Sequence, residues 1–296
     1  MAQIDVVVPD GSMQEVVVGL FAKAGLPIVM ANRRTKEGRV QAEWIRRVAF
    51  QRPQEIPQYL NSGHFDVAIV GEDWIANWGY TFPVLLKMPI GRAGSKPIRI
   101  VLAVSAASGI QRVEDLPKNS EVATEFVQLA QRFFKERHRP DIKVIPSYGN
   151  TEHKVRFGAT AIIDITESGE SLRENQLQII AEIMESNTVI VANPDSLKDE
   201  SKIASIDYFV RLMNGAFQAS QHVLLTANVP KGTLDAAVRV IGGLKGPSCS
   251  PLTGVEGWFA LQSVVRRENE QKIIFDLLKI GVTDIIVIRD VPLIMS

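Results

Sequence analysis

The chain has 296 residues, 46% of them hydrophobic and 22% charged, which is typical of a globular protein of two or three domains and excludes a disordered chain. Lysine and arginine together number 33, as do aspartate and glutamate, and this balance argues against broad binding to nucleic acid or to anionic membranes. The one cysteine, Cys249, excludes an intramolecular disulfide framework and a multi-cysteine zinc site.

The first half of the chain alternates short apolar runs, which predict buried strands, with amphipathic helical patterns. Strands separated by helices imply a parallel sheet with right-handed crossover connections. Ser12 and Glu15 have the spacing of a capping box, which predicts a helix over residues 13–24. Further helices are predicted over residues 54–61 and 125–137, and strands over residues 4–9, 26–31, 46–50, 66–71, 98–105, 121–123 and 142–146.

The second half ends in a different pattern of elements. Strands are predicted over residues 159–166, 178–183 and 188–192, and a long helix over residues 202–218 then connects to the rest of the chain. From about residue 219 the order becomes β-α-β-β-α-β, which is a ferredoxin-like unit. Its strands are predicted over residues 222–227, 258–266 and 284–289, with room for a short one in the Gly/Pro/Ser-rich loop 242–254, and its helices over residues 230–241 and 268–280.

The sequence AIIDITESGESL (161–172) predicts a buried strand that opens into a loop rich in serine and glycine. The carboxyl end of a parallel strand is a usual ligand site in α/β proteins. Gly169 lets backbone N–H groups approach a phosphate, and Thr166, Ser168 and Ser171 add hydroxyl donors. An ordinary strand-to-loop turn explains this pattern equally well.

Carboxylates in the same segment bear on both interpretations. Asp164 and Glu167 could accept hydrogen bonds from ribose hydroxyls or hold a magnesium ion. Glu167 and Glu170 would repel an anion, so they must point away from a bound phosphate or act through a cation.

Other segments are weaker candidates. Gly11 and Ser12 lie at the first strand-to-helix turn, where N–H groups could bind an anion, although a plain helix cap is the simpler interpretation. Glu72 and Asp73 follow Gly71 directly after a buried strand, and such a pair is often only the start of a helix. A basic group could attract polyphosphate or form a solvated loop; it comprises Arg33, Arg34, Lys36, Arg39, Arg46 and Arg47.

No other catalytic signature occurs. The motifs G-x-S-x-G, H-E-x-x-H, Walker A and G-x-G-x-x-G are missing, and the four histidines lack metal-ligand spacing. The start of the sequence, MAQIDVVVPDGS, lacks the basic region and the long apolar run of a signal peptide. No stretch approaches the roughly 20 apolar residues that span a bilayer. A cytoplasmic protein is therefore expected.

Four segments, in this order, resemble the ATP phosphoribosyltransferase family. The blocks are RPQEIPQYLNSGHFDVAIVGEDW (52–74), VATEFVQLAQRFF (122–134), AIIDITESGESLRENQL (161–177) and residues 250–287. The third block is similar to the family's phosphoribosyl pyrophosphate loop, and the last to the C-terminal regulatory domain found only in the long form. The resemblance covers nearly the whole chain.

The resemblance implies an α/β fold with a two-lobed catalytic core, like that of type II periplasmic binding proteins, followed by a ferredoxin-like βαββαβ domain. The first catalytic subdomain would comprise residues 1–98 and 187–218, and the second residues 99–186. The regulatory domain would comprise residues 219–296. The resemblance also implies assembly into homo-oligomers, from a dimer to a hexamer.

The chemistry implied by the resemblance is the first step of histidine biosynthesis. Adenine N1 of ATP attacks the anomeric carbon of phosphoribosyl pyrophosphate, and pyrophosphate leaves with magnesium. Asp164 would bind ribose hydroxyls and Arg52 would assist the leaving pyrophosphate. The loop for the 5-phosphate would comprise Thr166, Glu167, Ser168, Gly169, Glu170, Ser171 and Leu172.

The remaining expected residues also come from the resemblance. ATP would contact Gly11, Ser12, Gly71 and Asp73. Magnesium would bind Glu72, Asp73 and Asp164. Histidine, as feedback inhibitor, would bind Asn228, Leu244 and Ser248.

One departure from the family pattern is Asp10, where the first turn commonly carries lysine. This change removes a positive charge beside the expected anion site. Two alternatives therefore stay open: a non-catalytic two-lobed protein that binds a small ligand, and a regulatory subunit that senses an amino acid for a partner.

Overall fold

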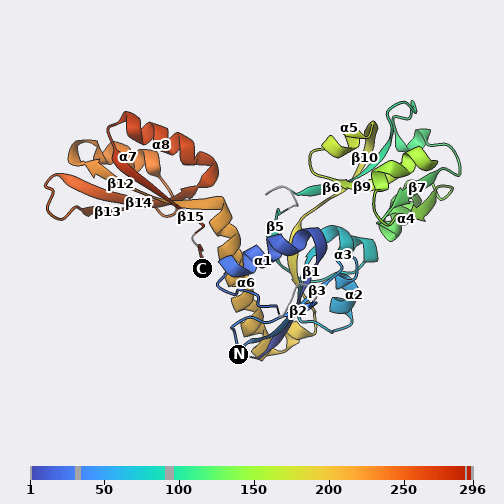
Figure 1. The fold of residues 1–296 in the computed structure, drawn as a ribbon, viewed down its shortest axis with the longest axis horizontal. Coiled ribbons are helices and arrows are strands. Elements are labelled where there is room, and N and C mark those ends of the chain that lie inside the picture. Colours follow the sequence, from blue (N-terminus) through green and yellow to red (C-terminus); the bar gives the residue numbers. More distant parts are fainter. Residues whose placement is uncertain (1, 31–34, 91–96, 291, 295–296) are drawn as a thin grey trace. The chain divides into compact units, whose positions relative to one another are not determined.

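The computed structural model describes residues 2–30, 35–90, 97–290 and 292–294 (Figure 1). The chain divides into two compact units, one formed by Met1–Val17 with Val29–Ile206 and the other by Val18–Ile28 with Asp207–Ser296. Arg33 and Arg34 of the basic group lie outside the described residues. No helix in the described part of the chain is long and apolar enough to cross a membrane.

The first unit contains two sheets. The strands of the first are β1 (Ile4–Pro9), β2 (Glu37–Gly38), β3 (Ile45–Gln51), β4 (Val67–Gly71), β5 (Val84–Met88) and β11 (Thr188–Ala192). Their order is β2-β3-β1-β4-β11-β5, and β1, β3 and β4 are parallel as expected. The prediction of a wholly parallel sheet is wrong, because β2 pairs with β3 and β11 pairs with β4 and β5 in antiparallel fashion.

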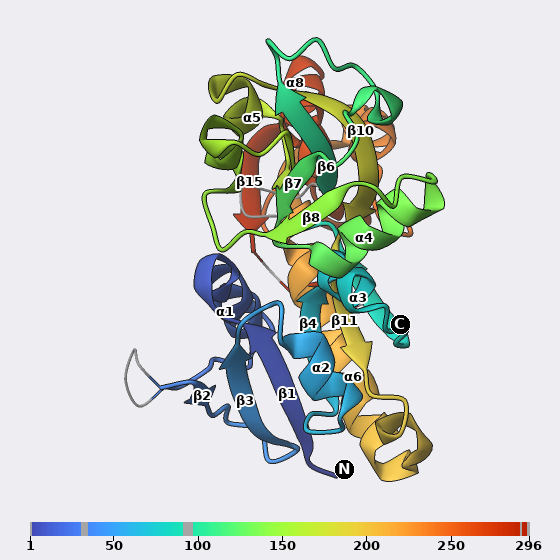
Figure 2. The same ribbon diagram turned by 90° about the vertical axis from the view of Figure 1, so that its right-hand side faces the viewer.

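The second sheet of this unit has the order β10-β6-β9-β7-β8. Figure 2 labels its strands β6, β7, β8 and β10. Its strands are β6 (Ile98–Ser105), β7 (Glu121–Thr124), β8 (Lys143–Pro146), β9 (Ala161–Thr166) and β10 (Leu177–Ser186). Strands β7, β8 and β9 are parallel, so their carboxyl ends meet at one edge of the sheet. The chain changes sheet between β5 and β6 and between β10 and β11, and we propose the subdomain boundaries near residues 98 and 187 on this ground.

One hydrophobic core contains residues of both sheets. The helices with residues in this unit are α1 (Gln14–Lys23), α2 (Ile56–Asn61), α3 (Glu72–Trp78), α4 (Val127–Glu136), α5 (Glu170–Glu174) and α6 (Glu200–Gln221). Trp74 of α3 packs on Phe126 at the start of α4, with ring centroids 4.5 Å apart. This contact links the two sheets' helices.

The structure corrects three local predictions. The capping box is wrong, because Ser12 lies inside a short 3₁₀ helix (Gly11–Met13) that makes no side-chain cap, and α1 begins only at Gln14. The strand predicted over residues 26–31 is reduced, in its described part, to one bridge between Val29 and Arg39. The strand predicted over residues 178–183 is longer, because β10 extends from Leu177 to Ser186, and it lies in a different sheet from β11.

The ferredoxin-like prediction for the second unit is confirmed. Its elements are β12 (His222–Pro230), α7 (Leu234–Ile241), β13 (Ser248–Pro251), β14 (Trp258–Arg266), α8 (Glu270–Lys279) and β15 (Thr283–Arg289). The strand order is β13-β14-β12-β15. Alternate residues of β12 are buried, starting at Val223, and they join the core that α7 and α8 cover.

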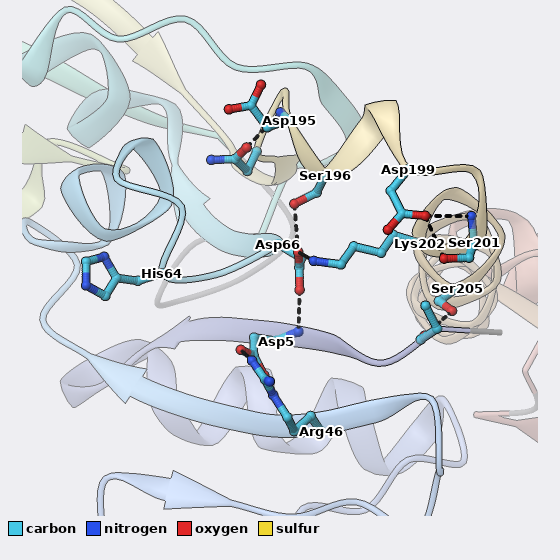
Figure 3. Close-up of polar contacts among 12 residues, drawn as sticks. Asp5, Arg46, His64, Asp66, Asp195, Ser196, Asp199, Ser201, Lys202 and Ser205 are labelled. Carbon is cyan, nitrogen blue, oxygen red and sulfur yellow. Dashed lines mark hydrogen bonds and ion pairs between the residues drawn. The ribbon is translucent and has the colours of Figure 1, made fainter.

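A buried carboxylate, Asp66, joins the amino-terminal edge of the first sheet to helix α6 (Figure 3). Its oxygens accept hydrogen bonds from the backbone N–H of Asp5 (2.8 Å), from Ser196 Oγ (2.7 Å) and from Lys202 Nζ (2.7 Å). Burial raises the pKa of Asp66, but the hydrogen bonds from Lys202, Ser196 and Asp5 outweigh it and hold this pKa below its usual value.

Asp66→Asn is expected to lower the free energy of unfolding by about 2 kcal/mol at neutral pH, because charged hydrogen bonds are lost. The pKa of Asp66 is lower in the folded protein than the reference value of 3.8, so its stabilisation is present above that pH and is lost as pH falls through the folded pKa. Urea denaturation at several pH values measures both effects, and the gap between variant and parent should close in acid. Asp195→Asn, which breaks only an exposed ion pair with Lys198, should leave stability unchanged.

Candidate functional site

An open pocket of about 650 Å³ lies in the first unit, beside the segment that joins β10 to β11. Gly71 and Asp73 line it after β4, Glu167 lines it after β9, and Ser12 lines it after β1. The structure therefore brings together four of the residues expected at the site, from segments that are far apart in the sequence.

Two polar residues at the β10–β11 junction, Ser186 and Asn187, form one wall of the pocket. Ser186 Oγ donates to Asp73 Oδ1 (3.0 Å) and accepts the backbone N–H of Asp73 (3.0 Å). The N–H and side-chain amide of Asn187 both donate to Glu72 Oε2 (2.9 Å each). The start of α3 is thus fixed to the segment where the chain changes sheet.

Glu72 also forms an ion pair with Lys87 of β5, with 3.1 Å between Lys87 Nζ and Glu72 Oε1. Partial burial raises the pKa of Glu72, but the hydrogen bonds from Asn187 and Lys87 prevail and hold this pKa below its usual value. The carboxylate of Glu72 is therefore charged at neutral pH and engaged in holding the backbone. Sequence reasoning missed Asn187 and Lys87, because neither lies in a segment with a local sign of function.

Gly71→Ala should reduce kcat/KM for the nucleotide substrate that the resemblance implies about 10- to 100-fold, since a displacement of about 1 Å in a site has effects of this size. The backbone at Gly71 (φ −75°, ψ 141°) permits alanine, but the added Cβ would lie 1.9 Å from Asp73 Oδ1. Asp73 must then move and lose its hydrogen bonds with Ser186. Steady-state kinetics measures the change, and Gly19→Ala, whose Cβ would meet nothing within 4 Å, is the control. Equal kinetics of the two variants would contradict the prediction.

The loop after β9 is shaped by its own hydroxyl groups. Thr166 Oγ1, which is buried, accepts the N–H of Gly169 (2.8 Å), and Ser168 Oγ accepts the N–H of Glu170 (3.3 Å). Gly169 has a φ of 76°, in the left-handed region that favours glycine. Leu172 is buried beneath the loop, whereas the side chains of Ser168, Glu170 and Ser171 are exposed.

Arg173 contributes a positive charge to this loop that sequence reasoning did not count. Its Nη1 lies 3.5 Å from the carbonyl oxygen of Ser168 and would be 3.6 Å from a Cβ at Gly169. Its guanidinium therefore adds a positive charge to a loop that also carries the carboxylates of Glu167 and Glu170. The signal was available, because residues four apart on a helix lie on one face and Arg173 follows Gly169 at that spacing.

Neither of the two expected catalytic residues is among the residues that line the pocket. Asp164 of β9 is half-buried, and its Oδ1 accepts the backbone N–H of Ile165 (2.7 Å). Arg52 is exposed and follows β3 directly, next to Pro53, which lines the pocket. Among the described residues, no group of three or more His, Cys, Asp or Glu is arranged to hold a metal ion, so Glu72, Asp73 and Asp164 do not form a three-ligand site.

The residues expected to bind histidine are only partly brought together. Ser248 is opposite Gln262, and Gln262 is opposite Thr226, two residues from Asn228 on β12. Directly opposed residues share a sheet face, so Ser248 and Asn228 lie on the same face. Asn228 Nδ2 donates to Asp284 Oδ2 (3.1 Å).

Leu244 lies elsewhere in the second unit. The N–H of Leu244 donates to the carbonyl of Val264. Val264 is opposite Leu224 on β12, and Leu224 is four residues from Asn228 along that strand. At about 3.3 Å per residue, this spacing corresponds to about 13 Å along the strand. Leu244 instead lines a separate pocket of about 600 Å³ with His222 and Arg266.

Comparison with known proteins identifies the family. A family model described as "ATP phosphoribosyltransferase" matches residues 52–215, and one described as "HisG, C-terminal domain" matches residues 219–289. The ATP phosphoribosyltransferase of Geotalea daltonii is 34% identical over 280 residues, covering 94% of each chain, and that of Desulfosudis oleivorans is 35% identical over 280 residues with the same coverage. The chain belongs to the ATP phosphoribosyltransferase family.

A solved structure supports the same fold for this family member. The "ATP phosphoribosyl transferase (HisG:HisZ) complex from Thermotoga maritima" has a TM-score of 0.61 and 24% identity, and the match covers 72% of this chain and 99% of that chain. The expected α/β fold and the C-terminal domain typical of the long form are both confirmed.

Asp10 is where this family member departs from the expected lysine. Its side chain is buried, and Lys36 Nζ lies 2.6 Å from its Oδ2. The other oxygen, Oδ1, is buried and has no hydrogen-bond partner among the described residues. An ammonium group is therefore present at the first turn after all, supplied by Lys36 from a neighbouring segment.

Proposed function

We infer that this chain is an ATP phosphoribosyltransferase, which transfers the phosphoribosyl group of phosphoribosyl pyrophosphate to N1 of ATP and releases pyrophosphate. Family membership across both catalytic and C-terminal parts carries this conclusion. The pocket supports it, because the turn after β4 and the loop after β9 contribute to one cavity through Gly71, Asp73 and Glu167. Two substrates that must react with each other need such a shared cavity.

We propose that the 5-phosphate binds the loop Thr166–Leu172, with the guanidinium of Arg173 adding positive charge. The exposed hydroxyls of Ser168 and Ser171 are neutral donors suited to a phosphate. Asp164 would accept hydrogen bonds from the ribose hydroxyls. In the reaction the bond from N1 to the anomeric carbon forms as the bond from that carbon to pyrophosphate breaks. Arg52 would stabilise the negative charge that develops on the leaving group.

Magnesium is the proposed cofactor, bound largely through the pyrophosphate oxygens. Mg²⁺ in enzymes of phosphorylated substrates usually uses one or two carboxylates and keeps several waters, so the lack of a three-ligand group among the described residues does not conflict with it. Glu72 and Asp73 are engaged with Asn187 and Ser186, which leaves Asp164 as the proposed protein ligand. When bound, the ion supplies charge neutralisation at the leaving pyrophosphate.

We keep feedback inhibition by histidine, through the C-terminal domain, as a proposal. Asn228 and Ser248 on the exposed sheet face remain its proposed ligands, whereas Leu244 lines a different pocket and supports this role less well. Assembly from a dimer to a hexamer and a cytoplasmic location belong to the same proposal, the latter because ATP and phosphoribosyl pyrophosphate are found there.

Turnover by the purified chain tests the function. Pyrophosphate release and a new near-ultraviolet absorbance are expected when ATP, phosphoribosyl pyrophosphate and magnesium are all present, and neither signal when one substrate is omitted. Folded protein without turnover would defeat the proposal. Binding of either substrate in calorimetry without product would favour a non-catalytic ligand-binding protein instead.

A further inference from the structure

Tyr148 leaves 93% of its surface exposed in the loop that follows β8. An aromatic side chain buries roughly 150–250 Å² when it packs, and a ring left in water forgoes this stabilisation. The described structure therefore gives no packing reason for an aromatic residue at this position.

The loop that carries Tyr148 is anchored on both sides. The N–H of Ser147 donates to the carbonyl of the last residue of β7 (2.9 Å), and Thr151 Oγ1 donates to Ser147 Oγ (2.9 Å). Ser147 and Thr151 are both buried. Between them, Gly149 and Asn150 have φ values of 100° and 50°, which turn the chain sharply. A fixed turn thus presents the ring.

Strand register puts Tyr148 at the same edge of the second sheet as the proposed phosphate loop. Thr124 at the end of β7 is level with Pro146 in β8 and with Ile163 in β9. Tyr148 follows Pro146 by two residues, and Ile165, which lines the pocket, follows Ile163 by two residues. Neighbouring strands lie about 4.8 Å apart, so β8 and β9, with β7 between them, are about 10 Å apart.

We propose that Tyr148 stacks on the adenine ring of ATP and so orients N1 toward the ribose held by the loop Thr166–Leu172; this inference rests on the proposed function. Of the two substrates, only ATP has an aromatic ring. Stacking on an aromatic side chain is worth roughly 1–3 kcal/mol per base. The separation between β8 and β9 leaves room for the ribose between the bound phosphate and the base.

Kinetics with two substitutions tests the stacking. Tyr148→Ala is expected to raise KM for ATP about 10-fold, within the range that stacking supplies, with KM for phosphoribosyl pyrophosphate unchanged. Tyr148→Phe keeps the ring and should retain the KM of the parent. Inhibition by adenosine should weaken in Tyr148→Ala, whereas inhibition by inorganic tripolyphosphate should not, because that anion has no ring.

Phe157 provides a matched control, since it is also 83% exposed but lies at the far end of the 3₁₀ helix Thr151–Phe157 that follows the same loop. Phe157→Ala should leave KM for ATP unchanged. The proposal is overturned if Tyr148→Ala keeps the KM of the parent, and a changed oligomeric state in ultracentrifugation would then assign Tyr148 to a protein contact. A parent chain without turnover would instead refute the proposed function itself.

Discussion

Gly169→Val is expected to lower kcat/KM for phosphoribosyl pyrophosphate about 100-fold or more, as does the loss of a positioned donor in other enzymes. Gly169 has a φ of 76°, which costs an L-residue roughly 1–2 kcal/mol and a β-branched residue more. The nearest atom to an added Cβ is Arg173 Nη1 at 3.6 Å, so the backbone, rather than space, resists the change. The loop would relax and lose the hydrogen bond between Gly169 and Thr166. Steady-state kinetics with phosphoribosyl pyrophosphate varied measures the effect.

Gly158→Val is the control that distinguishes an effect on the proposed phosphate loop from a general effect of backbone strain. Gly158 has a φ of 108° and precedes the amino end of β9, at the opposite edge of the sheet, with nothing within 4 Å of an added Cβ. This variant should lose thermal stability but keep the kinetic constants of the parent. The phosphate loop would be wrongly assigned if the two variants lost activity equally, or if folded Gly169→Val were fully active.

Much of the fold was predictable because its strands are buried on both faces and therefore form continuous apolar runs. The predicted boundaries of β6, β11 and β14 agree with the structure residue for residue. Strand β5 was not predicted, whereas the interpretation of Glu72 and Asp73 as the start of a helix agrees with α3. Val84–Met88 carries a lysine and an exposed valine, as an edge strand can, and the short α3 begins with the two carboxylates that suggested a site.

The direction of pairing was less predictable than the strands themselves. A local pattern fixes which residues form a strand but not the partner that it meets. Ser186 and Asn187 show this limit, because they contact Asp73 and Glu72 across more than a hundred residues of sequence. These two polar residues lie where the chain passes from one sheet to the other, and they form a wall of the pocket.

The candidate site was predictable only in part for a related reason. Gly71, Asp73 and Glu167 stood out because each follows an apolar strand, and the carboxyl ends of parallel strands meet at one edge of a sheet. The cations do not follow that rule. Lys36 reaches Asp10 from a neighbouring segment, and Lys87 reaches Glu72 from an edge strand, so their positions depend on tertiary structure.

Asp164→Asn is expected to reduce kcat/KM roughly 10- to 100-fold, because a hydrogen bond to a charged group is worth about 1.5–3 kcal/mol and each 1.4 kcal/mol corresponds to a factor of ten. Asparagine has the size of aspartate and its Oδ1 can still accept the N–H of Ile165, so the end of β9 should keep its shape. Only the negative charge offered to the ribose hydroxyls and to magnesium is removed. If the charge acts mainly in the transition state, kcat should fall more than KM rises.

Glu121→Gln is the matched control, because it also removes one negative charge from a strand of the same sheet. Glu121 is exposed at the start of β7, at the amino-terminal edge, whereas Asp164 lies near the carboxyl-terminal edge of the neighbouring strand β9. A general effect of net charge on anionic substrates would lower the activity of both variants alike. A specific role for Asp164 requires that Glu121→Gln remain as active as the parent and that a higher magnesium concentration restore part of the activity of Asp164→Asn. Full activity of Asp164→Asn would refute both proposed roles of this carboxylate, binding the ribose hydroxyls and binding magnesium.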